Sequence, residues 1–127
     1  MLALIRRYAW LLAVLWAGAV LVITLMPSRD VPAWPWAEKV QLDKFVHAFL
    51  FGMQSLLLGM ALAGMGEWRS RIGPSAVAAV AAIAFGGVIE LLQESMGAGR
   101  HGDILDLLAD AAGAIIGYGL LSWRSRK

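Results

Sequence analysis

Ionisable and amide side chains gather between positions 90 and 110, in the segment ELLQESMGAGRHGDILDLLAD, which lies between long apolar stretches. The groups with chemistry to offer are carboxylates, one guanidinium, one imidazole and one amide: Glu90, Gln93, Glu94, Arg100, His101, Asp103, Asp106 and Asp110. Ionisable groups inside a bilayer or at its edge are costly, and their default interpretation is functional. This segment is therefore the first candidate for a binding or catalytic site.

Helical spacing sorts these side chains onto shared faces, because residues three or four apart are neighbours on a helix. Glu90 and Gln93 fall together on one helix, and three aspartates align on the next: Asp103, Asp106 and Asp110. An upstream set has the same property, since four positions separate the first and last members of Asp43, Lys44 and His47. We expect the three sets to meet in one polar pocket.

The residue types allow two kinds of chemistry. Clustered carboxylates repel one another in a low-dielectric site unless a cation intervenes, and Arg100 and Lys44 are the internal cations. Arginine also offers a bidentate fork for carboxylate or phosphate. A divalent metal is the alternative, with Asp103, Asp106 and Asp110 as candidate ligands and His47 or Glu90 as candidate general base. Because no strict metal spacing such as HExxH occurs, no metal or cofactor is assigned.

Structural explanations compete for the same residues. Asp103 can cap a helix and Asp106 can favour its positive N-terminus, so the whole set can be an ion-pair network that only locks helices. Glu94 and His101 are expected to be solvated loop residues. Asp110 resists this explanation, because it lies about two turns into an apolar stretch, where a carboxylate costs ~2.5–3.5 kcal/mol. Its candidate partners are Arg100, Lys44 and His47.

Composition fixes the class of protein that must position these groups. The 127 residues are 60% hydrophobic and only 16% charged, whereas a soluble domain carries nearer a quarter. This indicates an all-α polytopic membrane protein with a single domain, 1–127. The absence of cysteine excludes disulfides and thiol chemistry. The net charge of +2 is small and dispersed, which argues against a nucleic-acid partner.

Four apolar stretches predict four transmembrane helices in a compact bundle, at about 8–26, 43–65, 75–93 and 104–123. The first stretch is longer than a cleaved signal core, so we expect it to remain as a helix. Pro27, Pro32 and Pro35 predict a connector without regular structure after it.

The distribution of Lys and Arg predicts the orientation of the four spans. Seven lie in the two tails and the second loop: Arg6, Arg7, Arg69, Arg71, Arg124, Arg126 and Lys127. Four lie in the first and third loops: Arg29, Lys39, Lys44 and Arg100. The positive-inside rule therefore places both termini in the cytoplasm and the polar pocket at the extracytoplasmic surface.

The combined order of these motifs resembles the VanZ-like family of small bacterial membrane proteins. The matching pieces are Asp43-Lys44-x-x-His47-x-Phe49, Glu90-x-x-Gln93, Arg100-x-x-Asp103-x-x-Asp106 and Gly113-x-x-x-Gly117. The resemblance covers about 42–121, and the first stretch fits an additional helix. The family is named for a protein linked to teicoplanin resistance, and it often has Asn where this chain has Asp110. The resemblance implies a cell-envelope role in the bacterial cytoplasmic (inner) membrane and supplies no reaction.

Three functions remain open. The first is an envelope protein whose pocket binds a lipid-linked cell-wall precursor or an anionic lipid head group and affects teicoplanin susceptibility. The second is a membrane-embedded, metal-assisted hydrolase or transferase that acts on a lipid head group. The third is a structural or assembly subunit. All three have the lipid bilayer as a partner and allow an oligomer, whereas four short spans show no paired inverted halves of a transporter.

Overall fold

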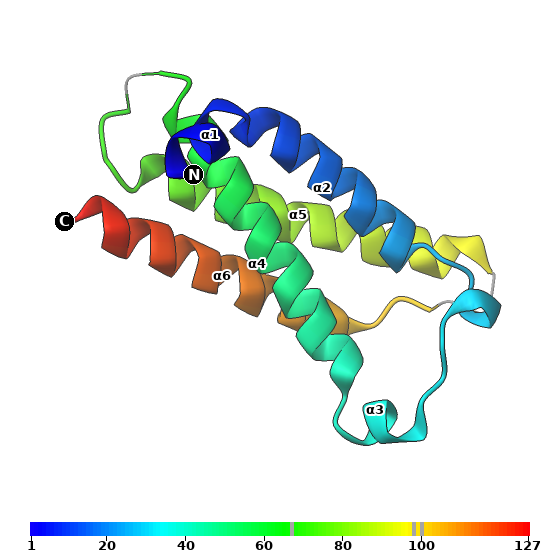
Figure 1. The fold of residues 1–127 in the computed structure, drawn as a ribbon. Helices are drawn as coiled ribbons and strands as arrows, with labels where there is room; N and C mark the ends of the chain where they lie inside the picture. The colour runs from blue at the N-terminus through cyan, green and yellow to red at the C-terminus, as the bar shows by residue number, and fades with distance from the viewer. Residues whose placement is uncertain (67, 98, 100) are drawn as a thin grey trace.

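The computed structural model describes residues 1–66, 68–97, 99 and 101–127. Within this part every regular element is a helix, which confirms the all-α class (Figure 1). The four longest helices are α2 (Ala9–Thr24), α4 (Leu42–Ala63), α5 (Gly73–Met96) and α6 (Ile104–Ser125). Three short helices accompany them: α1 (Leu2–Arg7), η1 (Ser28–Asp30) and α3 (Pro35–Lys39).

The long helices have the surface of a membrane protein. By length and hydropathy, α4, α5 and α6 can each cross a bilayer. Large apolar side chains point outward from them, including Phe49, Val80, Leu91 and Ile116, as expected for helices that face lipid. The α2 helix is apolar but has only 16 residues, or ~24 Å at 1.5 Å per residue, against a hydrocarbon core of ~30 Å.

The two ends of the bundle carry different parts of the chain (Figure 1). Both termini lie at one end together with the connection between α4 and α5, and we call this the terminal end. The opposite end holds η1, α3 and the connection between α5 and α6, and we call it the α3 end. The polar segments singled out in the sequence therefore gather at the α3 end.

Glycines allow α4 and α6 to pack closely. A Cβ atom added to Gly113 of α6 would collide with the backbone carbonyl of Ala48 in α4. A Cβ atom added to Gly117 would lie 2.9 Å from the carbonyl oxygen of Gly52. Small residues let membrane helices approach closely, and α4 is the helix that approaches α6 at these glycines.

Polar contacts attach α2 to this pair and to α5. The Trp16 indole donates to the carbonyl of Leu50 in α4 at 2.8 Å. Gln93 Nε2 of α5 donates to the carbonyl of Thr24, the last residue of α2, at 2.7 Å. Between these contacts lies a buried apolar core of Val20, Leu50, Phe51 and Ile89. Thus α2, α4 and α5 share one core that ends beside the polar set.

The connector after α2 differs from the prediction. We expected no regular structure there, and this is wrong, because η1 and α3 both form within it. Pro35 lies in the first turn of α3, where its fixed φ angle and missing N–H are suited to a helix start. At the same end of the bundle, α5 continues to Met96. Gly97, with φ of 65°, ends this helix.

Candidate functional site

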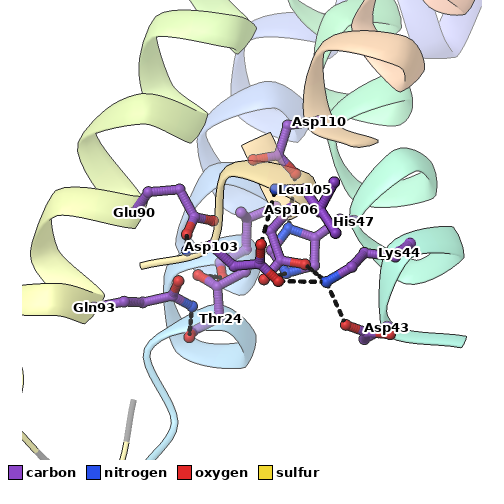
Figure 2. A network of polar contacts seen from close by, with 11 residues as sticks. Thr24, Asp43, Lys44, His47, Glu90, Gln93, Asp103, Leu105, Asp106 and Asp110 are labelled. Carbon is purple, nitrogen blue, oxygen red and sulfur yellow. Dashed lines mark hydrogen bonds and ion pairs between the residues drawn. The ribbon is translucent and has the colours of Figure 1, made fainter. Parts of the chain in front are cut away.

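The first part of the site is centred on Lys44, in the first turn of α4. Its ammonium group donates to Asp43 Oδ2 at 2.8 Å, Asp103 Oδ2 at 2.7 Å and Asp106 Oδ1 at 2.5 Å (Figure 2). An ammonium group has three donors, so all of them are used. We call these four residues the Lys44 cluster. It ties the start of α4 to the start of α6.

Asp103 is also the N-cap residue of α6. Its Oδ1 accepts from the backbone N–H of Leu105 at 2.8 Å, which caps the helix. Its own backbone N–H donates to Glu90 Oε2 of α5 at 2.8 Å. The hydrogen bond from Lys44, aided by the one from Leu105, lowers the pKa of the Asp103 carboxyl below its ordinary value. Asp103 is therefore a charged, well-paired residue.

The second part of the site is formed by His47, Glu90 and Asp110, which come from α4, α5 and α6. One nitrogen or oxygen atom of each lies within 4.8 Å of the other two. His47 Nδ1 and Asp110 Oδ1 are 2.7 Å apart. The residues are 7%, 8% and 0% exposed, respectively. We call them the His47 trio, and Figure 2 shows them beside the Lys44 cluster.

Oxygen atoms of the trio have unused hydrogen-bonding capacity. Glu90 Oε1 and Asp110 Oδ2 are buried, and neither has a hydrogen-bond partner among the described residues. The same is true of Oε1 of the neighbouring Gln93. A buried carboxylate is costly unless it is paired, protonated or bound to a cation. The trio contains two carboxylates and one imidazole, so it has room for added positive charge.

Gly86 on α5 makes room for the Asp110 carboxylate. A Cβ atom at Gly86 would lie 2.6 Å from Asp110 Oδ2, whereas a Cβ atom at the adjacent Gly87 would meet nothing within 4 Å. The structure assigns this contact to Gly86.

A pocket of about 510 Å³ opens beside the trio at the α3 end. Its polar wall includes His47, Asp106 and Gln93, and its apolar wall includes Trp34 and Val46. His47 therefore belongs to both the trio and the pocket. Sequence reasoning did not single out Trp34 as a site residue, since its only signal was the position of a tryptophan near a predicted membrane surface.

The structure divides the predicted site residues into two groups, which meet where Asp106 Oδ2 lies 3.6 Å from His47 Nε2. Asp103 and Asp106, two of the three candidate metal ligands, lie with Lys44, whereas Asp110 lies with His47 and Glu90. Arg100 lies outside the described residues. Glu94 belongs to α5 and not to a loop, and its carboxylate accepts from the backbone N–H of Gly102 at 2.7 Å. His101 is exposed and lines the pocket.

The donor set of the trio suits a divalent cation. Imidazole is a common ligand of Zn²⁺, and carboxylates suit Mn²⁺ and also bind Zn²⁺. Three protein ligands from three helices would leave coordination positions for water or a ligand, as in catalytic metal sites. The Lys44 cluster offers no comparable opportunity, because its cation already has three carboxylate partners.

Sequence comparison gives the family. A family model described as VanZ/LLP1 matches residues 13–125, which is most of the chain. The chain belongs to the VanZ/LLP1 family. The family resemblance seen in the sequence is confirmed, and the VanZ/LLP1 match also reaches into α2. It includes both the Lys44 cluster and the His47 trio. No curated protein and no solved structure matches this VanZ/LLP1 protein.

Proposed function

We propose that this VanZ/LLP1 protein crosses the bacterial cytoplasmic membrane four times, with its α3 end outside and both termini in the cytoplasm. The excess of Lys and Arg in the tails and second loop supports this orientation. For the fourth span, α1 and α2 together cover residues 2–24 with a break only at Tyr8. This combined length exceeds the ~20 residues that a span requires.

Cysteine labelling tests the orientation cleanly, because the chain contains no cysteine of its own. Trp36→Cys should react with an impermeant maleimide in intact spheroplasts. Arg126→Cys should react only after the membrane is permeabilised. If Arg126→Cys reacts in intact spheroplasts and Trp36→Cys reacts only after permeabilisation, the orientation is opposite to the one proposed.

We propose further that the His47 trio holds a divalent cation and that this cation binds the phosphate of a lipid-linked envelope component in the adjoining pocket. The observation that carries the proposal is the pair of buried, unpaired oxygens on Glu90 and Asp110, grouped with His47. The charge balance also supports the cation. Lys44 is already paired with three carboxylates, and the trio itself contains two carboxylates and one imidazole. The trio carboxylates would repel a phosphate on its own, whereas a cation bound to the trio would attract it.

The shape and lining of the pocket support a lipid-linked ligand. Its volume lies within the ~300–1,000 Å³ that is common for ligand pockets. Its polar side adjoins the trio through His47, and its apolar side includes Ile23, Val31 and Trp34. An isoprenoid diphosphate has this combination of groups, with a charged head and a hydrocarbon chain.

Binding of an isoprenoid diphosphate to the purified protein tests this assignment. With Mn²⁺ present, Trp34→Ala should weaken binding by about tenfold, which corresponds to ~1.4 kcal/mol. Trp36→Ala is the matched control, because Trp36 stacks on Trp34 at 6.2 Å but does not line the pocket. Removal of Mn²⁺ by a chelator should weaken binding of the isoprenoid diphosphate by the wild-type protein. Equal binding with and without chelator would contradict the role of the cation.

We also propose that this binding alters teicoplanin susceptibility, because a protein that holds a lipid-linked cell-wall precursor changes its availability. A susceptible host that expresses the wild type should show a changed inhibitory concentration. His47→Ala should abolish the change at equal protein level, and Glu94→Gln should retain it. If His47→Ala behaves as the wild type, the trio has no part in the phenotype.

A metal-assisted hydrolase is the second candidate, and one contact favours it. His47 Nε2 lies 3.6 Å from Asp106 Oδ2, and both residues line the pocket. If His47 holds the cation, the Asp106 carboxylate would be the general base for a water beside it. Water would add across a phosphoanhydride bond and release inorganic phosphate. Mn²⁺-dependent phosphate release that Asp106→Asn abolishes would support hydrolysis. Binding without release would identify a binding protein.

A further inference from the structure

A second pocket, of about 330 Å³, lies at the terminal end and shares no described lining residue with the pocket beside the His47 trio. Three arginines from separate parts of the chain line it: Arg6 of α1, Arg71 before α5 and Arg124 of α6. None of the three forms an ion pair with another described residue. All three residues are exposed, and their like charges line one pocket, so an anion bound between them would be stabilised.

The remaining polar features of this pocket also favour an anion. No carboxylate lies among its described lining residues. Pro74 and Ser75, in the first turn of the 24-residue helix α5, form part of its wall. The N-terminus of a helix carries partial positive charge, which adds to the field of the arginines. Arginine is also the side chain whose planar fork matches phosphate geometry.

The apolar features of the pocket favour an anion attached to a lipid. Met60 and Ala63 of α4 and Leu121 of α6 contribute the apolar part of the wall, at the ends of two helices that can cross a membrane. A pocket of this volume accepts a phosphate head but not an entire lipid, so the chains would continue along the outer faces of α4 and α6. Basic pockets between membrane helices commonly bind anionic lipid heads.

We infer that the pocket between Arg6, Arg71 and Arg124 binds the phosphate head of an anionic membrane lipid. This site is separate from the proposed cation site and does not depend on it. In the proposed orientation, the lipid belongs to the cytoplasmic leaflet.

The chain contains a matched control for each arginine of the pocket. Arg7, Arg69 and Arg126 lie one or two positions away and do not line the pocket. The triple variants R6Q/R71Q/R124Q and R7Q/R69Q/R126Q therefore remove the same charge from the same end of the protein. The single variants R71Q and R69Q repeat the comparison in case a triple variant fails to fold.

Native mass spectrometry from neutral micelles can measure the affinity for phosphatidic acid, with phosphatidylcholine as the zwitterionic reference. The pocket triple should weaken phosphatidic acid binding by about 100-fold, at roughly 1 kcal/mol per arginine. The control triple should stay within about threefold of the wild type, a difference of less than 1 kcal/mol. R71Q should likewise weaken binding more than R69Q. Equal losses in both members of each comparison would overturn the inference, because they would indicate general surface charge.

Inorganic phosphate tests whether the ligand is a lipid. It should fail to displace phosphatidic acid at equal concentration, because it makes no contact with the apolar wall. Displacement at equal concentration would overturn the assignment to a lipid head and indicate a site for free phosphate.

Discussion

The Lys44 cluster and the His47 trio are neighbours that are built from similar residues, yet they differ in how fully their charges are paired. In the cluster, one ammonium satisfies three carboxylates. In the trio, the imidazole of His47 contacts Asp110, Glu90 accepts only a backbone N–H, and each carboxylate retains an oxygen without a described partner. The two sets therefore have different roles. The paired charges hold α4 to α6, and the unpaired oxygens of the trio are those that the proposed cation would use.

Removal of the central cation should have the largest effect on stability. Lys44→Met leaves three carboxylates without their cation. Asp106 is largely buried, whereas Asp43 and Asp103 are partly exposed, so the loss should cost about 2–3 kcal/mol, less than for a fully buried pair. Unfolding in mixed micelles would measure this loss, with Lys39→Met on the exposed end of α3 as control. Mn²⁺ affinity should not fall, because Lys44 does not belong to the trio. If Lys44→Met is as stable as Lys39→Met, the Lys44 cluster does not hold α4 to α6.

Gly86→Ala should affect both stability and cation binding. Its new Cβ atom would press on Asp110 Oδ2, and overpacking of this kind costs about 2 kcal/mol. Displacement of Asp110 should also weaken the binding of Mn²⁺. Gly87→Ala has open space around its Cβ atom and should be neutral or stabilising in the same assays. Equal behaviour of the two variants would exclude this packing contact.

Asp110→Asn should separate stability from binding. Asparagine keeps an acceptor for His47 and removes a buried charge, so the free energy of unfolding should change by less than about 1 kcal/mol. Cation affinity should nevertheless fall, because an amide oxygen carries no formal charge. If Asp110→Asn instead destabilises the protein as strongly as Lys44→Met, the trio is as structural as the cluster.

The smallest expected effect concerns the response of the cluster to acid. Lys44 lowers the pKa of Asp103 from its ordinary value of 3.8, so the ion pair stabilises the protein above that pH. This contribution is lost as pH falls through the lowered pKa. Asp103→Asn should be less stable than the wild type by about 0.5 kcal/mol at pH 7, since the carboxylate is partly exposed. The two unfolding curves should converge once the pH lies below this lowered pKa, and a gap that persists there would show another cause.

Sequence spacing predicted much of the site but not its division into two parts. Residues three or four apart were enough to indicate the shared faces of Asp43–His47, Glu90–Gln93 and Asp103–Asp110. Which residue of one face meets which residue of another depends on the register between helices. That register is fixed where Gly113 contacts Ala48, a contact that a single sequence does not reveal.

Three further differences between sequence and structure have physical causes. Asp110 had three candidate cations, and the structure pairs it with His47. Lys44 has a flexible four-carbon stem, so sequence position alone could not show that it would reach three carboxylates on two helices. The α3 wall of the pocket was missed because prolines in a connector usually indicate irregular structure.

The most direct test of the central claim is the affinity of the purified protein for Mn²⁺ and Zn²⁺, measured by titration calorimetry. Glu90→Gln and Glu94→Gln form a matched pair, because both carboxylates accept a backbone N–H from the connection between α5 and α6, but only Glu90 belongs to the trio. We expect Glu90→Gln to weaken cation binding by about tenfold or more. Glu94→Gln should bind as the wild type does. No cation binding by the wild type, or equal losses in the two variants, would contradict the account.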